Sequence, residues 1–63
     1  MNIRQAIELA LEQEKMAKEK YLEMSRIAED QETRLMLEQI AREEESHYRR
    51  LLERLKAIKL MGK

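Results

Sequence analysis

The chain has 63 residues, enough for one small domain. Its 13 basic residues balance its 13 acidic ones, so its net charge does not favour binding to nucleic acid or to an anionic membrane. It contains no cysteine, which excludes a disulfide framework and a thiolate zinc or iron–sulfur site. The absence of proline, the single glycine and the 41% of charged residues indicate an all-α protein.

The first predicted element is an amphipathic helix over residues 3–28. Its apolar residues recur at steps of three and four, the spacing of one helix face. They are Ile3, Ile7, Ala10, Ala17, Tyr21, Met24 and Ala28, and Leu11 and Ile27 widen the stripe. The stripe is interrupted at Glu14, where a charged residue takes an apolar position.

The stretch AEDQETR, residues 28–34, lacks any large apolar residue and predicts a turn at 29–30. Asp30, the only aspartate, can accept hydrogen bonds from the free N–H groups at the start of a following helix. Glu32 is favourable in that first turn, where the helix dipole is positive. One bent or continuous helix remains an alternative, because the connection holds neither glycine nor proline.

The second predicted helix covers residues 31–61 and repeats the pattern. Its stripe contains Leu37, Ile40, Leu51, Leu55 and Ile58, with Ala41 and Tyr48 at its flanks. Glu44 and His47 interrupt it. Gly62 follows the last apolar residues, where a C-terminal cap belongs. Together the two helices predict an antiparallel two-helix hairpin, with residues 1–63 as a single domain.

Three consecutive glutamates, Glu43, Glu44 and Glu45, precede the only histidine. Glu44 is in phase with Ile40 and Leu51, so it belongs to the apolar stripe. The other two glutamates fall outside the stripe. Of the three, Glu44 is therefore expected to point inward.

The polar interruptions of the two stripes are expected to meet. An antiparallel hairpin centred near residue 29 sets Glu14 opposite Glu44, and His47 lies one turn further along. Unpaired carboxylates among apolar residues are costly, and a bound cation removes that conflict. A Glu and a His at i and i+3 point from one helix face and can reach the same metal. We therefore predict a metal site made of Glu14, Glu44 and His47.

Two readings without redox chemistry stay open. Glutamate is so frequent in this chain that a bare Glu-x-x-His spacing is a weak signal, and a lone histidine on an apolar face is more often a packed core residue. If His47 is such a core residue and no metal binds, the chain is a non-catalytic helical oligomerisation module. A bundle that holds zinc or manganese structurally is the other alternative.

A two-helix hairpin of this size should not be stable alone. We expect two hairpins to pair as a homodimer, or a higher multiple of dimers, into a four-helix bundle. A twofold axis crossing the bundle at mid-height brings two copies of the predicted site together, giving four carboxylates and two imidazoles. No apolar run approaches the roughly 20 residues of a transmembrane helix and no signal peptide is apparent, so we expect a cytoplasmic protein.

Two segments resemble half of a rubrerythrin or ferritin-like domain. They are EQEKMAKEKY, with Glu14 seven residues before Tyr21, and IAREEESHYRRLL, with Glu44, His47 and then Leu51. The resemblance covers nearly the whole chain. Family members usually carry four helices in one chain, whereas two are predicted here, and the cysteine-rich electron-transfer module of rubrerythrin is absent.

The resemblance implies a ferritin-like four-helix bundle with a di-iron centre, one iron per chain. Glu14 and His47 would be terminal ligands, Glu44 would bridge the two irons, and Tyr21 would donate a hydrogen bond to a carboxylate. It implies oxidation of Fe(II) by dioxygen or hydrogen peroxide, as in a ferroxidase or peroxidase. Manganese suits the same ligands, and zinc is a further candidate. An electron donor and an enclosing shell are partners that the sequence leaves unidentified.

Overall fold

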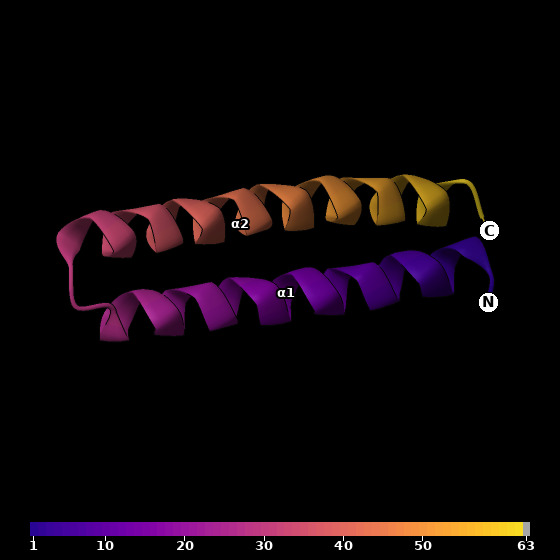
Figure 1. Ribbon diagram of the computed structural model, residues 1–63. Helices are drawn as coiled ribbons and strands as arrows, with labels where there is room; N and C mark the ends of the chain where they lie inside the picture. Colours follow the sequence, from indigo (N-terminus) through magenta and orange to yellow (C-terminus); the bar gives the residue numbers. More distant parts are fainter. Residues whose placement is uncertain (63) are drawn as a thin grey trace.

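Residues 1–62 are described by a computed structural model, in which two antiparallel α-helices are joined by a short turn (Figure 1). Helix α1 spans Ile3–Ile27 and helix α2 spans Gln31–Leu60. The two helices lie side by side, and the start of α1 and the end of α2 lie at the same end of the hairpin (Figure 1). The predicted hairpin is confirmed, and the alternative of one continuous helix is wrong.

Side-chain caps define where both helices begin. The backbone N–H of Gln5 donates to the side chain of Asn2 at 2.8 Å, and the backbone N–H of Asn2 donates back to Gln5 at 3.0 Å, which is a capping box. At the start of α2, the backbone N–H of Thr33 donates to the Asp30 carboxylate at 2.8 Å. This hydrogen bond holds the pKa of Asp30 below its ordinary value.

Both helices end one residue before the position expected from the sequence. Ala28 has an extended backbone, with φ −65° and ψ 132°, so α1 stops at Ile27. Helix α2 stops at Leu60, and Gly62 follows with a positive φ of 73°. Such a conformation is easily adopted only by glycine, which explains the position of the chain's only glycine.

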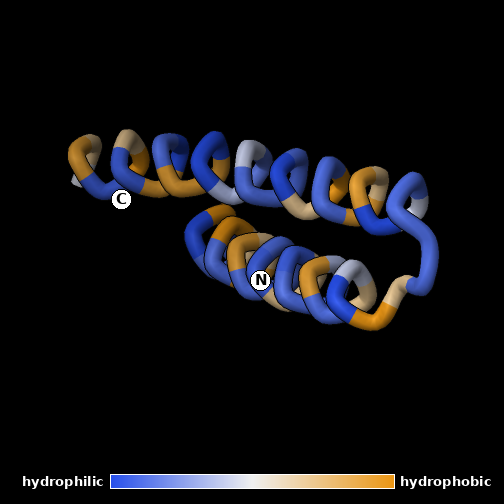
Figure 2. Tube along the Cα trace, turned by 90° about the vertical axis from the view of Figure 1, so that its left-hand side faces the viewer, coloured by the Kyte–Doolittle hydropathy of each residue, from blue (hydrophilic) through white to orange (hydrophobic). Residues whose placement is uncertain are grey.

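The core between the helices is narrow. Five apolar side chains are buried: Leu11, Leu37, Ala41, Leu55 and Ile58. More large apolar side chains stay exposed, namely Met1, Ile3, Leu9, Met16, Met24, Ile27, Leu35, Met36, Leu60 and Met61, and hydrophobic segments recur along both helices in Figure 2. The extended hairpin, 49 × 17 × 10 Å, thus leaves apolar surface uncovered, as expected of a chain that needs a partner. Neither helix has a stretch long and apolar enough to cross a membrane.

Candidate metal centre

The two helices bring three sequence-predicted residues into one cluster. Glu14 comes from α1, and Glu44 and His47 come from successive turns of α2. The Nδ1 atom of His47 lies 3.2 Å from Oε2 of Glu14 and 3.1 Å from Oε1 of Glu44. One donor atom from each residue lies within 4.8 Å of the other two. The turn and the phase of the two apolar stripes are sufficient to produce this convergence.

The cluster lies at the edge of the hairpin rather than inside it. The side chains of Glu14 and Glu44 are 25% and 18% exposed, whereas that of His47 is 46% exposed. His47 also borders an open hollow of about 440 Å³ with Arg50 and Leu51. We expected all three residues on stripes facing the core, but each stripe is wider than the contact that one neighbouring helix can cover. His47 occupies the uncovered flank.

The observed distances fit metal coordination as well as hydrogen bonding. A single Nδ1 atom carries at most one hydrogen, yet here it faces two carboxylates. Two donors that each lie about 2.1 Å from a cation, at angles near those of octahedral or tetrahedral coordination, are roughly 3.0–3.4 Å apart. The contacts at 3.1 and 3.2 Å fall in that range. Two carboxylates and one imidazole suit iron, manganese or zinc, and their charge balances one divalent cation.

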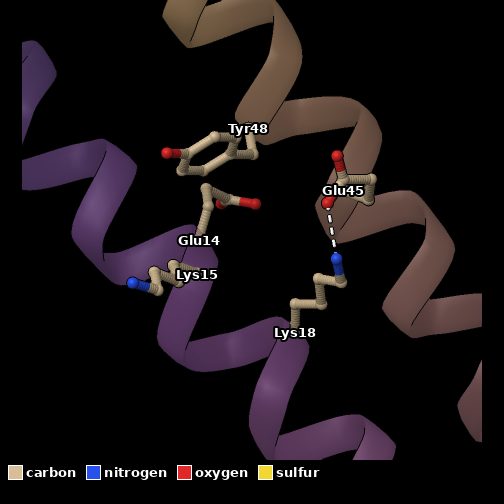
Figure 3. Close-up of a pocket in the computed structure, with 5 residues that line it drawn as sticks. All are labelled: Glu14, Lys15, Lys18, Glu45 and Tyr48. Carbon is tan, nitrogen blue, oxygen red and sulfur yellow. Dashed lines mark hydrogen bonds and ion pairs between the residues drawn. The ribbon is translucent and has the colours of Figure 1, made fainter.

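The two tyrosines differ in their relation to this cluster. Tyr21 is half-buried, and among residues 1–62 its hydroxyl makes none of the side-chain hydrogen bonds observed. Its predicted hydrogen bond to a carboxylate is not formed within one hairpin and stays a prediction for an assembled bundle. Tyr48 instead lies beside Glu14, and its hydroxyl points away from the Glu14 carboxylate (Figure 3).

An ion pair that the sequence analysis did not predict lies next to the cluster. The Lys18 ammonium on α1 donates to Oε1 of Glu45 on α2 at 2.7 Å, and Nε of Arg49 donates to Oε2 of Glu45 at 3.0 Å. The hydrogen bond from Lys18, followed by that from Arg49, lowers the pKa of Glu45. Lysine, arginine and glutamate are too abundant in this chain for their spacing to have marked the pair.

Glu14 is also reached from a second hollow, of about 210 Å³, lined by Glu14, Lys15, Lys18, Glu45 and Tyr48 (Figure 3). One residue step turns an α-helix by about 100°. Glu45, one step after Glu44, and His47, three steps after it, therefore lie on opposite sides of Glu44. The second hollow and the ion pair thus lie on the side of the helix–helix contact away from His47.

The fold and the cluster define an all-α hairpin protein in which two helices jointly present a carboxylate-rich, histidine-containing site. The Rubrerythrin family model matches residues 1–61. The chain therefore belongs to the rubrerythrin family, and the resemblance seen in the sequence is confirmed. No curated protein and no solved structure gives a significant match to the chain.

Proposed function

We propose that this protein is a di-iron carboxylate protein whose metal centre is assembled across a homodimer and oxidises Fe(II) with dioxygen or peroxide. The observation that carries the proposal is the convergence of Glu14, Glu44 and His47, from two helices, at the uncovered edge of the hairpin. Family membership supports it, because peroxidase-type chemistry is typical of rubrerythrins. The two carboxylates balance the charge of one Fe(II) ion, and carboxylate and imidazole are ligand types that suit iron.

A second copy would complete the centre. One hairpin offers three donor side chains, and their charge balances a single divalent ion. Two hairpins offer four carboxylates and two imidazoles, which balance two Fe(II) ions, so that the assembled centre is neutral and can be buried. The half-buried Ile40 and Leu51 on the same flank as His47 give the second copy an apolar surface on which to pack.

Each side chain has a separate role in this proposal. Glu14 and His47 would hold one iron from opposite helices, and Glu44 would be shared with the iron of the second copy. Iron bound there would supply one electron per metal, and a pair would supply the two electrons that reductive cleavage of a peroxide O–O bond requires. The Nδ1 atom of His47 can bind a metal only when its proton has left, which leaves the imidazole hydrogen on Nε2. Metal binding at Nδ1 therefore selects the His47 tautomer that carries its hydrogen on Nε2.

Native mass spectrometry of protein that has been anaerobically loaded with Fe(II) tests the proposal. We expect a dimer, or a multiple of dimers, that carries two irons per pair of chains. The Glu44→Ala variant should lose the iron, whereas Glu43→Ala, which changes the neighbouring exposed residue, should keep it. An oligomer without metal would favour the non-catalytic oligomerisation module. Metal that binds without consuming oxidant would favour a structural zinc or manganese bundle.

A further inference from the structure

The position of α1 relative to α2 determines whether Glu14 meets Glu44 and His47. Apolar contacts hold the helices together but are non-directional, so they permit small shifts along and around the helix axes. Hydrogen-bonded contacts have defined geometry and resist such shifts. Between α1 and α2, the described residues make two such side-chain contacts: Glu14 with His47 inside the cluster, and Lys18 with Glu45 outside it.

We propose that the Lys18–Glu45 ion pair is a positioning pair that holds Glu14 in register with Glu44 and His47, an inference that rests on the proposed function. Lys18 follows Glu14 by one helical turn on α1, and Glu45 directly follows Glu44 on α2. The distance of 2.7 Å between Nζ of Lys18 and Oε1 of Glu45 is that of a charge-assisted hydrogen bond. The pair therefore connects the two helices at the level of the cluster.

The placement of the pair complements the Glu14–His47 contact. Glu45 and His47 lie on opposite sides of Glu44 around α2, because they are one and three residue steps away from it. Rotation of α1 about its own axis, or sliding along α2, would therefore lengthen at least one of the two contacts. With both contacts in place, the carboxylate of Glu14 is directed to one position.

Glu45 is itself fixed by a second cation. Its Oε1 atom accepts from Lys18 and its Oε2 atom accepts from Arg49, one turn further along α2, at 3.0 Å. Both carboxylate oxygens thus have a partner, which restricts rotation of the side chain. Arg49 and Glu45 belong to the same helix, so their contact adds no link between helices. It orients the Glu45 carboxylate so that Oε1 can accept the hydrogen bond from Lys18.

The pair is a poor candidate for a role in global stability alone. Lys18 and Glu45 side chains are 37% and 32% exposed, and ion pairs that are open to solvent contribute little to the free energy of unfolding. Its loss should therefore change the geometry of the cluster more than the unfolding temperature. This difference separates a positioning role from a merely stabilising one.

Three variants test the inference in the metal-free protein. Lys18→Met removes the ammonium but keeps an unbranched side chain, Lys18→Arg keeps the charge, and Lys20→Met makes the same change at an exposed lysine of α1. His47 is the only histidine, so its ring protons give resolved NMR signals. We expect cross-relaxation between these protons and the Glu14 side chain in the wild type, Lys18→Arg and Lys20→Met, and its loss in Lys18→Met. Undiminished cross-relaxation in Lys18→Met would overturn the inference.

Titration with Co(II) provides a second readout, because its visible spectrum reports coordination geometry. We expect Lys18→Met to bind Co(II) about tenfold more weakly, the low end of the loss seen when a residue that orients a metal ligand is replaced, and to show an altered band. Lys18→Arg should restore both properties. Unchanged affinity and spectrum in Lys18→Met would also count against the inference. A wild type that binds no metal would instead refute the proposed function, while the metal-free NMR comparison still decides the role of Lys18.

Discussion

Glu14 and His47 are 33 residues apart in the chain, yet Oε2 of Glu14 lies 3.2 Å from Nδ1 of His47. The contact arises because the turn after Ala28 reverses the chain and sets the middle of α1 against the middle of α2 (Figure 1). Glu44 joins them from α2. Neither helix alone contains the cluster, so metal binding should depend on an intact hairpin.

Glu14→Gln should weaken metal binding although the side chain keeps its shape. The amide is neutral and a poorer ligand than a carboxylate, so we expect affinity for Fe(II) or Mn(II) to fall by at least about 100-fold, more than is typical for a residue that only supports a ligand. Anaerobic calorimetric titration measures the change. Glu12→Gln, at an exposed position of the same helix, is the matched control. Equal affinity in the Glu14 and Glu12 variants would remove Glu14 from the ligand set.

Glu44→Leu should stabilise the metal-free protein while abolishing stabilisation by metal. The Glu44 side chain is only 18% exposed, and a carboxylate in that position is less favourable than an apolar side chain of similar size. In the wild type, added metal should raise the unfolding temperature by mass action. Thermal unfolding followed by circular dichroism, with and without Mn(II), tests both effects. A metal-dependent rise that persists in Glu44→Leu would contradict the expectation.

Ile40→Glu should prevent assembly. Ile40 is half-buried and is predicted to lie on the same flank of α2 as His47, so a charge there would have to be desolvated when a second copy covers that flank. Sedimentation velocity should show monomers or unfolded chains at concentrations at which the wild type is expected to form the proposed dimer. Leu9→Glu is the control, because Leu9 is an exposed position on the other helix, α1. Dimers that persist in Ile40→Glu would place the interface elsewhere.

Asp30 should make the start of α2 sensitive to acid. The hydrogen bond from the Thr33 backbone N–H holds the pKa of Asp30 below its ordinary value of 3.8. Its contribution to stability is therefore fully present above that unfolded-state value and is lost as the pH falls through the lower folded-state pKa. The decline in unfolding temperature below about pH 4 should be smaller in Asp30→Asn, which keeps an uncharged cap. Glu29→Gln, beside it, should follow the wild type from pH 6 to pH 2.

Ala41→Leu should destabilise the hairpin and disturb the cluster together. Ala41 is 1% exposed and lies one turn before Glu44, so a larger side chain would force the helices apart. We expect a loss of about 1–3 kcal/mol in the free energy of unfolding, measured by urea denaturation, and weaker metal binding in the same protein. Ala57→Leu, at a half-buried position near the end of α2, should leave metal affinity unchanged.

The hairpin and the three clustered residues could be predicted because both depend on local periodicity. The spacing of apolar residues gives the phase of each helix, and Asp30 marks the point at which the second helix begins. Phase alone does not say which flank of a wide stripe the neighbouring helix covers. For that reason the exposure of His47 was not predicted. The Lys18–Glu45 pair and the position of Tyr48 beside Glu14 depend on side-chain reach across the helix pair, which periodicity does not contain.

Both ends of the hairpin lie together (Figure 1), and this placement limits how two copies could be fused into one polypeptide. In the proposed dimer the twofold axis crosses the helices, so the end of α2 in one copy and the start of α1 in the other lie at opposite ends of the bundle. A tandem duplication would need a segment that runs the length of the hairpin, 49 Å, or about 14 extended residues. Four-helix bundles of the ferritin type have one such long crossover between their helices. The hairpin geometry therefore prescribes where that crossover must run.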